Sequence, residues 1–181
     1  MQGRASFRKA DVIAAEWPRG FDVVILGGNC FYELATPAEQ EGCIAAAASA
    51  LNPGGYLYLD NDHMEGNLAR SWCHLGVDEN VFPTGVCADG TQIYGASETV
   101  WYDEKRRLVR FHRSVTVQTK DGDIRRREWT QQKHPPSTLE MSVWLNTHGF
   151  VTEHLWGDRQ RASYSSESER AVFWAKKSGG T

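Results

Sequence analysis

A cluster of polar side chains, Asp60-Asn61-Asp62-His63, directly follows the apolar run Tyr56–Leu59. A strand that ends in such a cluster brings several hydrogen-bond donors and acceptors to one place. His63 can take up a proton near neutral pH, because the ordinary pKa of histidine lies close to neutrality. A histidine that simply lies at the surface fits the sequence equally well. We therefore predict a polar site at this point of the fold, with His63 as its candidate catalytic residue.

A second candidate site lies at the end of the segment Phe21–Leu26. Its apolar residues run without polar alternation into Gly27, Gly28 and Asn29. Such a run predicts a strand buried on both faces, as in parallel sheets. The glycines allow a sharp turn and the close approach of a ligand. Asn29 would lie just beyond the carboxyl end of the strand, where open α/β sheets bind ligands, although a core strand that ends in a tight turn is the alternative.

The elements that position these residues form a βαβ unit. Thr36-Pro37-Ala38-Glu39 predicts a helix start with a capping box and a proline in the first turn. The alanine-rich helix runs to about Leu51, and Asn52-Pro53-Gly54-Gly55 ends it before the strand Tyr56–Leu59. Ahead of this unit, Ala5–Asp11 is a candidate short strand that ends in an acid. The order strand, helix, strand predicts an α/β fold.

The middle of the chain predicts antiparallel strands. Three alternating segments are present, at Gln92–Tyr102, Leu108–Thr119 and Ile124–Lys133. Asp121-Gly122 is a two-residue hairpin turn between the last two. Arg113 falls on the otherwise apolar side of its segment, so it is either a pocket residue or the mark of a β-bulge.

The last third of the chain predicts a helix and two closing strands. Ser137 begins a capped helix that ends at Gly149, and strands follow at Phe150–Trp156 and Arg170–Lys176. Residues near Glu65–Trp72 could form a further helix.

The composition excludes several classes of protein. The 181 residues suit a single globular domain, and a net charge of -3 gives no overall attraction to nucleic acid or to an anionic membrane. Arg125-Arg126-Arg127 could form a nucleic-acid patch, but a solvated strand edge is the better interpretation. The four cysteines show no CxxC spacing, the histidines show no metal-binding spacing, and no signal peptide or membrane-spanning run is visible. We therefore expect a cytoplasmic protein without a metal.

Three segments taken together resemble a known family. FDVVILGGNCFYEL, TPAEQEGCIAAAASALNPGG and YLYLDND resemble the second half of a class I S-adenosylmethionine-dependent methyltransferase. The similarity is greatest to the glycine N-methyltransferase-like branch that acts on small molecules. It implies a partial Rossmann-like sheet, residues 1–63 and 134–177, with a three-stranded antiparallel insertion, residues 64–133, over the substrate.

The resemblance also implies roles for individual residues. The cofactor would be S-adenosyl-L-methionine, and a methyl group would pass to nitrogen or oxygen of a small molecule. Asp62 stands where the glycine enzymes carry an arginine, which favours a cationic or amine substrate. The residues implied at the cofactor are Asp11, Val12, Leu26, Gly27, Gly28 and Asn29, and those implied at the substrate are Asn61, Asp62, His112 and Arg113.

One departure from the family affects the expected assembly. The glycine-rich motif that follows the first strand of the family is absent, and residues 1–20 cannot hold it. The strand at Phe21 would then lack its inner neighbour and would leave an apolar edge open. We therefore expect a homodimer or a complementary N-terminal chain. The competing hypothesis is a non-catalytic remnant that serves as a binding or assembly subunit, and a ligand-binding role for residues 92–133 alone is a third.

Overall fold

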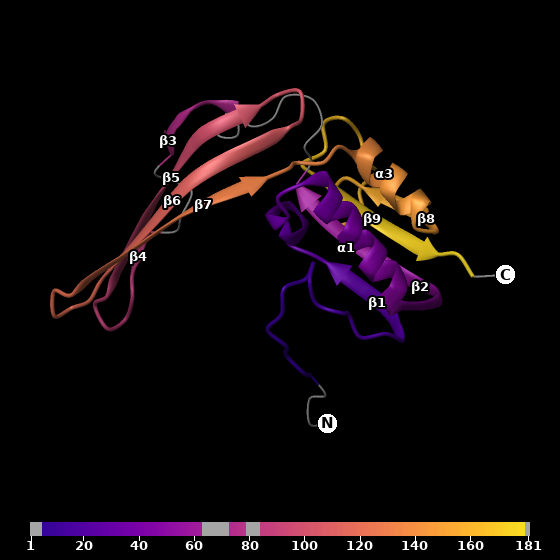
Figure 1. The fold of residues 1–181 in the computed structure, drawn as a ribbon, viewed down its shortest axis with the longest axis horizontal. Helices are drawn as coiled ribbons and strands as arrows, with labels where there is room; N and C mark the ends of the chain where they lie inside the picture. Colours follow the sequence, from indigo (N-terminus) through magenta and orange to yellow (C-terminus); the bar gives the residue numbers. More distant parts are fainter. Residues whose placement is uncertain (1–4, 63–72, 79–83, 180–181) are drawn as a thin grey trace.

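The computed structural model describes residues 5–62, 73–78 and 84–179. Four strands form one sheet, which we call sheet A: β1 (Phe21–Leu26), β2 (Leu51–Asp62), β9 (Arg170–Lys177) and β8 (Phe150–Trp156), in the order β1-β2-β9-β8. β1 and β2 are parallel, whereas β9 is antiparallel to both of its neighbours (Figure 1). β1 is therefore an edge strand.

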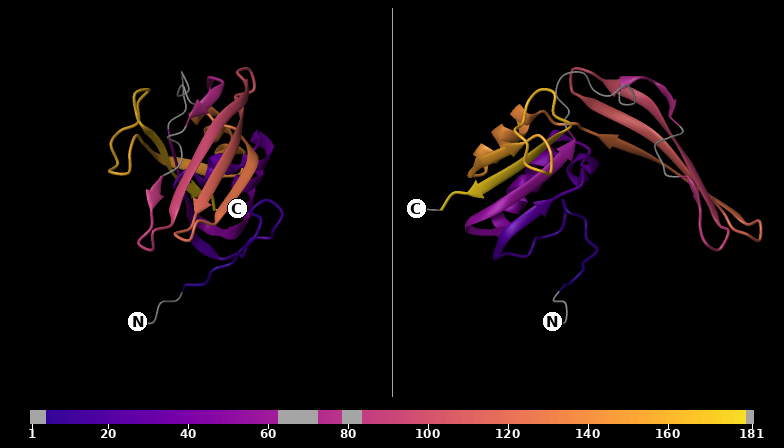
Figure 2. Two further views of the ribbon diagram at one scale, coloured as in Figure 1. Left: turned by 90° about the vertical axis from the view of Figure 1, so that its left-hand side faces the viewer. Right: turned by 180° about the vertical axis from the view of Figure 1, so that it is seen from behind.

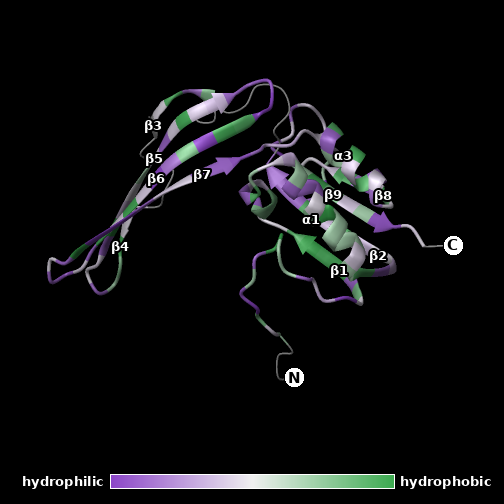
Figure 3. Cartoon of the chain, in the orientation of Figure 1, coloured by the Kyte–Doolittle hydropathy of each residue, from purple (hydrophilic) through white to green (hydrophobic). Residues whose placement is uncertain are grey.

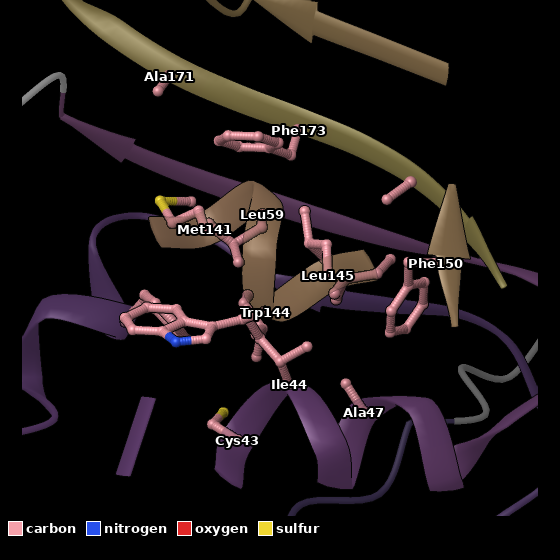
Figure 4. Packing of buried hydrophobic residues seen from close by; sticks show 14 of the residues in the cluster. Cys43, Ile44, Ala47, Leu59, Met141, Trp144, Leu145, Phe150, Ala171 and Phe173 are labelled. Carbon is pink, nitrogen blue, oxygen red and sulfur yellow. The ribbon is translucent and has the colours of Figure 1, made fainter. Parts of the chain in front are cut away.

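Two helices cover one face of sheet A. α1 (Pro37–Ala50) and α3 (Thr138–Thr147) each begin with a capping box, at Thr36 and Ser137 respectively. The capping boxes hold the first amides of both helices, as the sequence predicts. Side chains of the two helices meet those of β2, β9 and β8 in a single core (Figure 4). The labelled core side chains are Cys43, Ile44, Ala47, Leu59, Met141, Trp144, Leu145, Phe150, Ala171 and Phe173.

A second sheet, sheet B, extends away from the first. Its long strands are β5 (Gln92–Asp103), β6 (Leu108–Gln118) and β7 (Ile124–Lys133), and short strands β3 (Gly76–Asp78) and β4 (Gly85–Val86) pair with β5. The three long strands project from the helix-covered part as an arm (Figures 1 and 2).

The α/β fold with a partial Rossmann-like sheet and an antiparallel insertion is therefore confirmed. The division of the chain at residues 63/64 and 133/134 stays a prediction. The candidate helix near Glu65–Trp72 lies outside the described residues. No helix in the described ranges is long and apolar enough to cross a membrane.

Two local predictions were wrong, and one of the two alternatives for Arg113 is excluded. Residues Ala5–Asp11 form no strand, and residues 11–15 form an exposed turn. Apart from Asp22, β1 is apolar (Figure 3), yet it is not buried on both faces, because among the described residues no strand lies beyond it and no helix covers its second face. The bulge in sheet B falls between Thr99 and Trp101, so Arg113 marks no bulge and sits in regular pairing with Trp129.

Candidate functional site

A polar network joins the carboxyl ends of the two parallel strands. The Asn29 Nδ2 group donates to Asp62 Oδ2 at 2.7 Å, and the Asp62 amide donates to Asn29 Oδ1 at 2.8 Å. Arg170, the first residue of β9, donates to Asp62 Oδ1 at 2.6 Å and to Asn29 Oδ1 at 3.0 Å. The loop after β1 and the end of β2 are thereby held together by both backbone and side-chain bonds.

Asp60 forms the buried half of this network. Its side chain is only 3% exposed, and it accepts hydrogen bonds from Arg170 Nε at 2.6 Å and Arg159 Nε at 2.9 Å. Burial alone would raise the pKa of Asp60, but the hydrogen bonds and charges of the two arginines outweigh it and lower the pKa. Asp60 is therefore an ionised carboxylate at neutral pH.

The loop after β1 adopts a left-handed backbone at two successive residues. Gly28 has φ 66° and Asn29 has φ 64°. The Asn29 amide donates to the Asp60 carbonyl at 3.2 Å, and the Tyr32 hydroxyl donates to the Asp62 carbonyl. A Cβ atom at Gly28 would meet nothing within 4 Å, so the main chain here borders open space. The loop thus presents bare backbone at the carboxyl end of the parallel pair, where α/β sheets bind ligands.

The predicted cofactor residues lie in different surroundings. Gly27, Gly28 and Asn29 form the loop itself, whereas the Leu26 side chain is 8% exposed and belongs to the core. The side-chain oxygen and nitrogen of Asn29 are both engaged in the network, its amide donates to the Asp60 carbonyl, and its carbonyl accepts from the Tyr32 amide at 3.0 Å, so Asn29 mainly holds the loop in shape.

Asp11 and Val12 lie in the exposed turn that precedes β1. The carboxylate of Asp11 accepts from the amides of Ile13 at 2.8 Å and Ala14 at 3.2 Å, and thus caps this turn. The Val12 side chain is 48% exposed. The described contacts do not bring these two residues together with the loop after β1.

The predicted substrate residues on β2 point in opposite directions. Asn61 alternates with Asp60 and Asp62, so its side chain lies on the same side of the strand as the buried Leu59. Asn61 is fully buried, and neither side-chain polar atom has a hydrogen-bond partner. Of the two predicted substrate residues on β2, Asn61 and Asp62, only Asp62 joins the network at the strand end. His63 lies outside the described residues.

His112 and Arg113 also lie on opposite faces, because they are neighbours on β6. Arg113 is on the face of sheet B that meets the segment η1 (Cys30–Glu33). There Glu33 accepts hydrogen bonds from Gln131 Nε2 and Lys133 Nζ. Burial would raise the pKa of Glu33, but these bonds and the nearby Arg113 lower it, so Glu33 stays ionised. The sequence-predicted pair therefore contributes one residue, Arg113, to this side of the insertion.

Sequence reasoning missed four residues of the site: Arg159, Arg170, Tyr32 and Glu33. Arg170 is the first residue of the last strand, β9. Once β9 is known to lie beside β2, an arginine at this position predicts ion pairs with Asp60 and Asp62. The order β2-β9 is not visible in the sequence, so that signal needs the fold. Among the residues that the structure describes, no group of acidic, histidine or cysteine side chains could hold a metal ion.

Comparisons with known proteins give a fold but no close relative. No protein-family profile matches the sequence, and no curated protein matches it at a significant level. Solved structures do match. A S-adenosylmethionine-dependent methyltransferase from Clostridium acetobutylicum is 14% identical, with a TM-score of 0.70 over 94% of this chain and 63% of its own. The chain has the fold of a methyltransferase.

Two further similar structures are described as methyltransferases that act on sugars. CalS10 from Micromonospora echinaspora, an amino pentose methyltransferase solved with SAM bound, is 20% identical with a TM-score of 0.62, over 93% of this chain and 63% of its own. The sugar N-methyltransferase KedS8 from a Streptoalloteichus species is 20% identical with a TM-score of 0.67, over 93% of this chain and 61% of its own. The chain thus spans less than two thirds of the length of each of these three structures.

Proposed function

We propose that this chain is the C-terminal portion of an S-adenosylmethionine-dependent methyltransferase that acts on a small molecule. The observation that carries the proposal is the bare loop Gly27–Asn29, locked by Arg170 and Asp62 at the carboxyl end of a parallel strand pair. The methyltransferase fold of the solved structures supports it.

The residues of the loop suit one side of a nucleoside cofactor. Gly28 leaves open space beside the main chain, so a flat ligand can approach the backbone closely. The carbonyls of Gly27 and Asn29 accept from the amides of Cys30 and Tyr32, and the second lone pair of each carbonyl would serve the cofactor. Bound here, S-adenosyl-L-methionine would supply a methyl group on a sulfonium, which is already activated for displacement. By the same resemblance, Asp11 and Val12 are proposed at the adenine.

The chain's own residues then have to bind and align the acceptor. Asp62 is 44% exposed on its side chain, and each of its carboxylate oxygens can accept one more hydrogen bond beside those from Arg170 and Asn29. We therefore place an amine of the substrate at Asp62, with nitrogen or oxygen as the acceptor atom. His63 remains the proposed proton acceptor, and Arg113, His112 and Asn61 remain proposed substrate residues.

The names of two solved neighbours favour an amine substrate. CalS10 is described as an amino pentose methyltransferase and KedS8 as a sugar N-methyltransferase. A carboxylate at the strand end is the group that would recognise a protonated amine before transfer. We propose a cytoplasmic enzyme that works as a homodimer or together with a complementary chain.

A non-catalytic assembly subunit is the second candidate function. The observation that favours it is the open edge of β1, where Ile25 is 68% exposed and Val23 is 42% exposed. A chain that lacks a glycine-rich phosphate- or ribose-binding turn could keep the fold for its surfaces alone.

Isothermal titration with S-adenosylmethionine tests the proposal, first on this chain and then on a longer form that carries a glycine-rich segment. We expect saturable binding by the longer form, and at least tenfold weaker binding after Gly28→Val. Gly54→Val is the matched control, because Gly54 also has a positive φ, 77°, and open space around it, but lies at the opposite end of β2. A longer form that binds no cofactor would refute the methyltransferase assignment and leave the assembly subunit.

A further inference from the structure

The last strand of the arm, β7, has a free edge. Sheet B runs in the order β3-β5-β6-β7, so among the described residues β7 pairs with β6 only. In Figure 1, β7 forms one margin of the arm. The main-chain amides and carbonyls on its outer side therefore have no strand beside them in the part of the chain that the structure describes. Such an edge can accept one more strand.

One face of the arm beside this edge is basic and apolar. Residues directly opposite each other in an antiparallel sheet point to the same face, and two such pairs are Val115–Arg127 and Val117–Arg125. Trp129 follows Arg127 by two residues, so it points to the same face, and it is 37% exposed. We call these five residues the basic face. A hollow of about 770 Å³ lies along the edge, lined by Val115, Val117, Arg125, Arg126, Arg127 and Trp129.

The acidic side chains nearby point to the other face of the arm. Glu128 alternates with Arg127, and its carboxylate pairs with the Arg126 guanidinium at 2.6 Å. Glu98 of β5 lies opposite His112, which also belongs to that other face. Arg125 and Arg127 have no acidic partner among the described residues. The basic face therefore offers two arginines that can pair with carboxylates from outside the chain.

The charges along β7 disfavour a second copy as the partner. A two-fold axis at Arg125, Arg126 or Arg127 would join two copies of β7 with that arginine opposite itself. An axis at Glu128 would oppose two glutamates. Like charges directly opposite each other destabilise a strand pair. The edge is thus protected against its own copy but remains attractive to an acidic strand.

The spacing of the basic face fits an extended peptide. Arg125 and Arg127 are two residues apart on one strand, which sets their main chains about 6.5–7 Å apart. A strand laid beside β7 has the same repeat, so its alternate side chains would meet Arg125, Arg127 and Trp129 in turn. Single-stranded nucleic acid binds along several stacked aromatic rings. Trp129 is the one aromatic residue of the basic face, which favours the peptide.

We propose that β7 and the basic face bind an acidic segment of a partner protein as an added strand. The segment runs antiparallel to β7, as the long strands of sheet B do to one another. From its N-terminus it places an apolar side chain opposite Trp129, an acidic one opposite Arg127 and a second acidic one opposite Arg125, with one residue between each. Main-chain hydrogen bonds hold the segment, and the ion pairs and the apolar contact set its register.

Fluorescence anisotropy with a labelled peptide and the full chain tests this proposal. In the probe peptide, threonines alternate with a valine and then two glutamates. The control peptide has the same composition but carries the two glutamates side by side, so only one of them can face the arginines. We expect saturable binding of the probe and at least tenfold weaker binding of the control peptide.

Two single variants locate the peptide on the arm. Arg127→Gln should weaken binding of the probe at least threefold, and the double variant Arg125→Gln/Arg127→Gln at least tenfold. Arg126→Gln is the matched control, because it removes the same charge one residue away on the other face, and it should change the affinity less than twofold. The bound probe should also slow hydrogen exchange of the β7 amides at least fivefold. The amides of β8, an edge strand of sheet A, should exchange as before.

The other outcomes overturn the proposal. Equal binding of the two peptides, or equal loss in Arg126→Gln and Arg127→Gln, would show a general attraction between charges. An oligothymidylate that binds more tightly than the probe would make nucleic acid the ligand, and inorganic pyrophosphate that displaces the probe at equal concentration would make this a small-anion site. Unchanged exchange of the β7 amides would exclude an added strand, and no binding at all would leave the edge in water. No step uses S-adenosylmethionine, so this proposal and the methyltransferase assignment stand or fall separately.

Discussion

Replacing Arg170 with methionine should destabilise the fold more than any other change at a partly exposed arginine of the site. Methionine keeps much of the length of the side chain and removes its charge and donors. The change takes away the bonds to Asp60, Asp62 and Asn29 at 2.6, 2.6 and 3.0 Å. The Asp60 carboxylate, 3% exposed, then keeps Arg159 as its remaining arginine partner.

The expected cost follows from the burial of Asp60. Removing one partner of a buried ion pair typically costs roughly 3–5 kcal/mol. Because Arg159 remains at 2.9 Å from Asp60 Oδ2, we expect the lower end, about 3 kcal/mol. With a urea slope of about 2 kcal/mol per molar, the unfolding midpoint should fall by about 1.5 M. Urea denaturation followed by tryptophan fluorescence measures it.

The pH dependence of this cost separates a charge effect from lost packing. The lowered pKa of Asp60 means that its stabilisation is present above the unfolded pKa of about 3.9 and is lost as pH falls through the folded value. Without Arg170, the pKa of Asp60 loses the hydrogen bond and charge that oppose its burial most strongly, and it rises from its lowered value. The deficit of Arg170→Met should therefore be largest near pH 7 and shrink below about pH 4.

Arg159→Met is the matched control, because the Arg159 side chain is 53% exposed and its ion pair is screened by solvent. We expect it to cost about 1 kcal/mol or less. If Arg170→Met unfolded at the wild-type urea concentration, or if both variants lost the same stability at pH 7 and pH 3.5, the assignment of the network as a buried charge cluster would be wrong.

Three further predictions concern the helices and the contact between the sheets. Burial lowers the pKa of His134, against the opposing charge of Glu140, so the unfolded chain takes up the proton first; stability should fall as pH drops below about 6.5, and His134→Gln should flatten that slope in urea titrations. Thr36→Ala should lower the free energy of unfolding by about 1 kcal/mol through loss of the capping bond to the Glu39 amide, and an unchanged urea midpoint would contradict it. Gln40→Ala should cost about 1–3 kcal/mol, because the buried carbonyls of Phe31 and His134 lose their shared donor; a calorimetric scan that shows no shift would count against this.

Local signals in the sequence predicted the elements well. The capping residues Thr36 and Ser137 begin α1 and α3, and Asp121-Gly122 turns the hairpin between β6 and β7. These features depend on side-chain to backbone bonds within a few residues, so a local pattern contains them.

Long-range signals were harder to read. β2 continues to Asp62, so Asp60–Asp62 alternates across the sheet, and Asn61 points into the core instead of toward the site. Arg170 lies 110 positions after Asp60, and no local pattern shows that β9 runs beside β2. The apolar run in β1 indicated side chains suited to burial, but it did not show which element, if any, would cover them.

The contact between Glu33 and the insertion ties the two sheets to the loop after β1. Glu33 follows Asn29 by one short helical turn and accepts bonds from Gln131 and Lys133, while Gln132 Nε2 donates to the Ala35 carbonyl at 3.0 Å. A movement of sheet B would therefore also move η1 and the hydrogen bonds of Asn29 to Asp62 and Arg170. The base of the arm and the hydrogen bonds of Asn29 thus share one short segment, η1, so the positions of the two are coupled.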